Sequence, residues 1–70
     1  MTISYRIIET NGYTLIESGG CTYAEEDLSD SIWLVNRELR AGLPKREQLK
    51  ARRQVATYEV LLSALRSAGA

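Results

Sequence analysis

Residues 5–18 read YRIIETNGYTLIES, and this stretch decides how the fold begins. Two runs of β-prone residues flank the pair Asn11-Gly12. An Asn-Gly pair suits a two-residue type I′ turn, because both central residues of that turn need a positive φ angle. We therefore predict a β-hairpin over residues 3–18.

The turn also fixes which hairpin residues lie opposite one another. In the register that it sets, Ile7 faces Ile16 and Arg6 faces Glu17. One face of the hairpin carries Ile3, Tyr5, Ile7 and Ile16, and this face should meet the helices. The opposite face is half apolar. An isolated two-stranded hairpin is barely stable in water, so helices are expected to cover it.

A helix is expected after the glycine pair Gly19-Gly20, which should end the sheet. Thr22 and Glu25 match the spacing of a capping box, which predicts a helix over residues 23–40. Arg37 and Arg40 would lie in its last turn, before Gly42. Its core-facing residues recur every three or four positions: Leu28, Ile32, Val35 and Leu39.

A second helix is predicted over residues 44–67, with Pro44 at its first position. Its core-facing residues are Ala51, Val55, Tyr58, Leu62 and Leu65. The link between the helices is so short that they should form an antiparallel hairpin. The sequence therefore predicts a single α+β domain over residues 1–70, an N-terminal β-hairpin followed by a two-helix hairpin (ββαα).

Composition excludes several kinds of site. The chain has one cysteine, Cys21, and no histidine, so we expect no intrachain disulfide, metal centre or cofactor. No apolar run has the length of a membrane span, and the N-terminus does not resemble a signal peptide. We expect a cytoplasmic protein that does not enter the membrane.

Catalysis has little support, and we expect no enzyme. Without histidine, neither a Ser-His-Asp nor a Cys-His arrangement can form. Cys21 comes just before the first helix, whose dipole could activate a thiol, but nearby carboxylates disfavour a thiolate. We expect Cys21 to be buried and inert, as free cysteines often are.

The helices carry more apolar residues than one core-facing stripe needs. Trp33 and Leu34 point away from the stripe of the first helix, and a weaker second row follows the other helix at Leu49, Ala56, Val60 and Ala64. A helix that is apolar on two sides is usually covered on both, which favours a homodimer or a complex with another protein. We take Trp33, Leu34, Leu49 and Val60 as candidate partner-binding residues. Alternatively, the hairpin covers Trp33 and the weaker row is simply exposed.

The aromatic residues divide in the same way. Tyr5 is assigned to the inner face of the hairpin and Tyr58 to the core, whereas Tyr13 and Tyr23 are expected to be exposed. Trp33 is the best candidate for an interface anchor, since tryptophan is enriched in binding hot spots.

Charge is sorted along the chain, although its formal net value is zero. Residues 1–36 have a net charge near −5 and residues 37–70 near +5. We define an acidic patch as Glu25, Glu26, Asp27 and Asp30. We define a basic patch as Arg37, Arg40, Lys45, Arg46, Lys50, Arg52 and Arg53.

Each patch has more than one interpretation. The basic patch could be solvated or paired with the acidic patch, could bind an acidic protein, or could bind nucleic acid through a helix–turn–helix-like corner at residues 37–53. Few side chains there could read bases, and a pI near 6.2 is low for a nucleic-acid-binding module. The acidic patch could cap its helix or imitate phosphates, as small phage-encoded inhibitors do.

The function expected from the sequence is that of a small non-enzymatic protein–protein interaction module. It would act as a homodimer and serve as a regulator, inhibitor or assembly adaptor, of a kind found in phages and mobile elements. The alternative is a nucleic-acid-binding accessory protein that uses residues 37–53.

Overall fold

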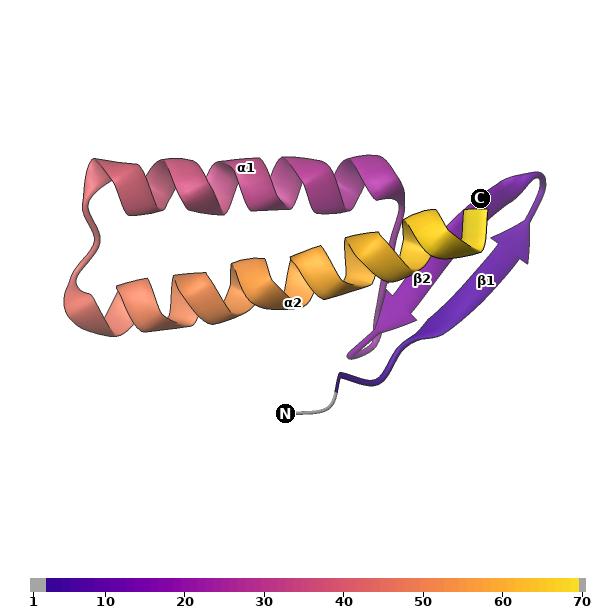
Figure 1. Cartoon of the computed structure of the whole chain (residues 1–70), viewed down its shortest axis with the longest axis horizontal. Coiled ribbons are helices and arrows are strands. Elements are labelled where there is room, and N and C mark those ends of the chain that lie inside the picture. The colour runs from indigo at the N-terminus through magenta and orange to yellow at the C-terminus, as the bar shows by residue number, and fades with distance from the viewer. Residues whose placement is uncertain (1–2, 70) are drawn as a thin grey trace.

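The sheet lies at one end of a long helical hairpin (Figure 1). The computed structural model describes residues 3–69. Its elements are β1 (Arg6–Thr10), β2 (Tyr13–Ser18), β3 (Cys21–Tyr23), α1 (Glu25–Ala41) and α2 (Lys45–Gly69). The strands form an antiparallel sheet in the order β1-β2-β3. The predicted α+β arrangement, with strands followed by two helices, is confirmed.

The first turn has the predicted geometry. Asn11 and Gly12 have φ angles of 49° and 80°, as a type I′ turn requires. The register is also the predicted one, with Ile7 opposite Ile16 and Arg6 opposite Glu17. The Asn-Gly pair therefore determines which hairpin residues face the helices.

The prediction that Gly19-Gly20 ends the sheet is wrong. Both glycines have positive φ angles, 60° and 81°, and they form a second two-residue turn. The chain then reverses into β3, which pairs with the end of β2 so that Ile16 lies opposite Tyr23. A Gly-Gly pair adopts this turn as readily as Asn-Gly does, since glycine has no Cβ to clash at positive φ.

The third strand changes how α1 begins. Thr22 lies within β3, so the predicted capping box from Thr22 to Glu25 is wrong. The N-cap residue is Ala24, whose amide donates a hydrogen bond of 2.9 Å to the carboxylate of Asp27. Asp27 therefore satisfies one of the free amides at the start of the helix. The other helix boundaries lie within two residues of those predicted.

The core is concentrated where the helices meet the sheet. Its fully buried side chains are Ile16, Leu28 and Leu61, with Leu62 and Leu65 packed beside them. Leu61 was not predicted, because it lies off the main apolar stripe of α2. It is buried because β2 also packs against the C-terminal half of α2.

Tyr23 is half-buried and packs against this core, which corrects the expectation that it is exposed. Its ring meets that of Tyr58 edge to face, with the centroids 6.0 Å apart. Burial raises the pKa of Tyr23 above its ordinary value, and a hydrogen bond with the Cys21 side chain adds to the shift. Tyr5, by contrast, is exposed, so its assignment to the inner face of the hairpin is wrong.

The half of the helical hairpin that is distant from the sheet has a thin core. We call it the distal half, residues 33–57, which includes the turn between the helices (Figure 1). Within residues 3–69, Ala51 is the one buried residue of this half. Val35, Leu39 and Val55 are only half-buried, because two helices without a third layer cannot cover them fully. Neither described helix has an apolar stretch of the length needed to cross a bilayer.

Candidate interaction surface

The side of α1 that faces away from the core carries a second regular row of residues. We call this row the α1 outer stripe; it consists of Glu26, Asp30, Trp33 and Arg37. Each member precedes a core-facing residue by two positions, which is about 200° around the helix axis. All four side chains are exposed. The stripe therefore presents two acids, an aromatic ring and a cation to the surroundings, in that order.

Trp33 is the apolar centre of this surface. It is 61% exposed, and the neighbouring Leu34 is 51% exposed, so the hairpin does not cover Trp33. The guanidinium of Arg37 lies over the ring, 5.6 Å from its centroid. Such a cation–π contact contributes about 0.5–1 kcal/mol at an exposed site. It holds the charged end of Arg37 beside the ring rather than free in solvent.

A second apolar row lies on the outer side of α2. Leu49 and Val60 are 62% and 46% exposed, and Ala56 lies between them. We call these three residues the α2 outer row. Ala64, which the sequence placed in the same row, instead packs against the core. The four candidate partner-binding residues thus lie on two different helices, and the structure does not bring them into one cluster.

The two charged patches occupy opposite ends of the helical hairpin. The acidic patch is at the start of α1, beside the sheet, whereas the basic patch surrounds the turn between the helices and the beginning of α2 (Figure 1). Among residues 3–69, the ion pairs are Arg6–Glu17 at 3.2 Å and Arg66–Glu25 at 3.0 Å. Neither pair involves the basic patch. Within the part of the chain that is described, no ion pair therefore joins the two patches.

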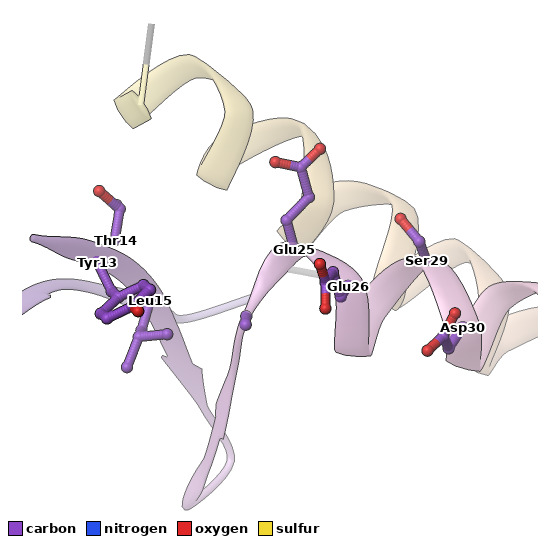
Figure 2. Close-up of a pocket in the computed structure, with 8 residues that line it drawn as sticks. Tyr13, Thr14, Leu15, Glu25, Glu26, Ser29 and Asp30 are labelled. Carbon is purple, nitrogen blue, oxygen red and sulfur yellow. The ribbon is translucent and has the colours of Figure 1, made fainter.

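The acidic patch borders an open hollow of about 670 Å³. Glu25, Glu26, Ser29 and Asp30 project from α1 on one side of it, and Tyr13, Thr14 and Leu15 come from β2 on the other (Figure 2). The hollow lies where β3 has ended, beside the free edge of β2. In the described residues, no three acidic or sulfur side chains are grouped so that they could hold a metal ion.

Cys21 is exposed, which corrects the expectation that it is buried. It is the first residue of β3, directly after the Gly19-Gly20 turn, and neither glycine has a side chain that could cover it. Its thiol is therefore accessible.

Comparison with protein-family models, curated proteins and solved structures gave no match.

Proposed function

We propose that this chain is a small non-enzymatic protein–protein interaction module, a regulator, inhibitor or assembly adaptor that acts as a homodimer. The observation that carries the proposal is the exposure of Trp33, Leu34, Leu49 and Val60 on helices whose distal half has no third layer. Exposed large apolar side chains on a helix face are typical of interaction surfaces, and each helix carries two of these four residues. Their burial against a partner would remove apolar area from water.

The distribution of the core supports the same proposal. A chain of 70 residues buries a smaller fraction of its surface than a larger domain does, and here the fully buried side chains lie at the sheet end. Association along the helices would supply apolar contacts that the distal half lacks. A partner that binds only the folded chain would also stabilise the folded state, by mass action.

The separated charges would contribute orientation and rate more than affinity. Complementary potentials steer two proteins together and disfavour incorrect partners, whereas exposed ion pairs add little free energy each. On this proposal, the apolar residues provide most of the affinity. The acidic and basic patches determine the orientation in which the chain and its partner bind.

Binding of nucleic acid is a second candidate function. The observation that favours it is the exposure of all seven basic-patch residues around one turn, at residues 37–53. Binding to a mixed DNA and RNA pool should then weaken steeply as salt rises, and Arg46→Ala with Arg53→Ala should flatten that dependence. Absence of binding at low salt would remove this candidate.

Affinity capture with a matched variant tests the proposed function. Wild-type protein and a Leu49→Ser, Val60→Ser variant, both immobilised, are incubated with extract of the source cells, and the retained proteins are quantified. The variant should keep its fold, because both side chains are exposed, and should lose the proteins that the wild type retains. Equal retention by both proteins would argue against binding through the α2 outer row.

A further inference from the structure

We propose that two copies of the chain associate through their α1 outer stripes, which pair antiparallel about a two-fold axis near Trp33 and Leu34. This inference rests on the proposed homodimer and specifies its interface. The exposed face of α1 would thus bind the same face of a second copy of the chain. The order of charges along that face favours this pairing.

The α1 outer stripe is complementary to its own reverse. Its acids, Glu26 and Asp30, precede Trp33, and Arg37 follows it, with Arg40 almost one turn further on. Asp30 and Arg37 are about 10 Å apart along the axis, since an α-helix rises 1.5 Å per residue. A two-fold axis midway between them places each Asp30 opposite the partner's Arg37. The same axis brings Glu26 close to the partner's Arg40.

The large exposed apolar residues of α1, Trp33 and Leu34, lie at the midpoint of the stripe. Trp33 and Leu34 flank the proposed axis, so they would contact Trp33 and Leu34 of the second copy. Two-fold interfaces bury the same patch on both subunits, which suits a patch with an apolar centre and charged ends. Burial of the tryptophan would supply affinity, and the surrounding ion pairs would fix direction and register.

Arg37 is already positioned for this contact. Its guanidinium is held over the Trp33 ring, and within residues 3–69 it forms no ion pair with a carboxylate. An arginine stacked on an aromatic ring retains its hydrogen-bond donors for a carboxylate. The partner's Asp30 would therefore meet a cation whose position requires little further ordering.

The other exposed surfaces do not have this self-complementary order. The outer edge of β1 is open, but Arg6 and Glu9 project from opposite faces of the strand, so no two-fold register places them opposite each other. In an antiparallel pairing about the midpoint of the α2 outer row, the basic neighbours Arg46 and Arg53 would lie opposite positions 63 and 56 of the second copy, which are uncharged, so these cations would meet no acid. This row would remain available for a different, acidic partner.

Charge exchange at the two central positions tests the interface. The Asp30→Arg variant has arginine at positions 30 and 37, and the Arg37→Asp variant has aspartate at both positions. In a homodimer of either variant, like charges would therefore face each other. We expect each single variant to dimerise roughly tenfold or more weakly than the wild type. Sedimentation equilibrium measures the dissociation constants, and circular dichroism verifies that these exposed substitutions leave the fold intact.

Two recombinations then separate specific pairing from general damage. An equimolar mixture of the two single variants should form heterodimers, because each arginine then meets an aspartate. The double variant Asp30→Arg, Arg37→Asp should regain most of the self-association. Glu59→Arg, a charge reversal at an exposed position of α2 outside both charged patches, is the matched control and should leave the dimer unchanged.

The outcomes distinguish this inference from the proposed homodimer. If the wild type dimerises and the single variants dimerise equally well, the interface lies elsewhere, and this inference fails while the homodimer stands. If the mixture of single variants stays monomeric although the wild type dimerises, the proposed pairing is also overturned. A wild type that is monomeric at every soluble concentration would overturn both the homodimer and its interface.

Discussion

The guanidinium of Arg37 lies 5.6 Å from the centre of the Trp33 ring, on the side of α1 that faces away from the core. This contact joins the largest exposed apolar side chain of the helix to the first cation of the basic patch. A single turn of α1 thus presents both an apolar anchor and a charge to a partner. The proposed antiparallel pairing uses both.

Replacement of Trp33 by Ala should abolish self-association and leave the helix content of the monomer unchanged. The reason is that the side chain is 61% exposed and so contributes little to the core, whereas the proposed interface has it at its centre. Sedimentation equilibrium and far-ultraviolet circular dichroism measure the two effects. Tyr13→Ala, which removes an exposed aromatic residue from the sheet, should leave self-association intact. Unfolding of the Trp33 variant would show that Trp33 is a core residue.

Truncation of Leu61 should be far more costly than truncation of Leu49 on the same helix. Leu61 is 1% exposed at the centre of the core, whereas Leu49 is mostly exposed. Leu61→Ala should lower the free energy of unfolding by about 2–5 kcal/mol, and Leu49→Ala by about 0.5 kcal/mol or less. Urea denaturation at one protein concentration measures both. Similar losses for the two variants would contradict the assigned core.

Gly20→Ala should destabilise the protein by about 1–2 kcal/mol. Gly20 has a φ angle of 81° in the turn before β3, where an L-residue is strained even though a Cβ would meet no neighbouring atom. The same substitution at Gly69, near the end of α2, should be neutral or slightly stabilising, because alanine favours a helix. Thermal unfolding of both variants gives the comparison. A neutral Gly20→Ala would argue against the tight turn and hence against β3.

Stability should fall at alkaline pH, in part because of Tyr23. Burial, and secondarily the hydrogen bond with Cys21, raises the pKa of Tyr23 in the folded protein above its ordinary value of 10.0. The folded state then retains a proton that the unfolded state releases, so this stabilisation is complete below pH 10.0 and is lost as pH rises through the folded pKa. Urea denaturation across this range should show a falling free energy of unfolding. Tyr23→Phe should reduce that fall, and an unchanged slope would contradict the raised pKa.

The sequence predicted those parts of the fold that depend on local patterns. Asn11-Gly12 determined the first turn and its register, and the spacing of Leu28 and Leu62 with their neighbours located the helix faces that contain the core. These features follow from backbone preferences and from helical periodicity, both of which are visible in a short window of residues.

The parts that it missed depend on tertiary packing. Gly19-Gly20 is compatible both with the end of a sheet and with a tight turn, and only the pairing of β3 with β2 decides between them. Leu61 lies off the main stripe of α2 and is buried because the sheet covers that flank. Tyr23 packs against the core for the same reason, since β3 brings it against Tyr58.

The candidate site was predictable in composition but not in arrangement. The sequence identified the two charged patches and the exposed apolar residues. It left open whether the patches meet within one chain, and the described ion pairs, Arg6–Glu17 and Arg66–Glu25, do not join them. The self-complementary order of the α1 outer stripe became apparent only once its residues were shown to be exposed together.

Light scattering measures the solution mass over a range of protein concentrations at low and moderate salt, and it shows directly whether two chains associate. The proposed homodimer should appear as a particle of about twice the 7.8 kDa of one chain. This dimer should persist at moderate salt because its contact is centred on Trp33, while its dissociation constant should rise with salt as the ion pairs are screened. A mass of 7.8 kDa at every concentration and both salt levels would contradict the proposed homodimer.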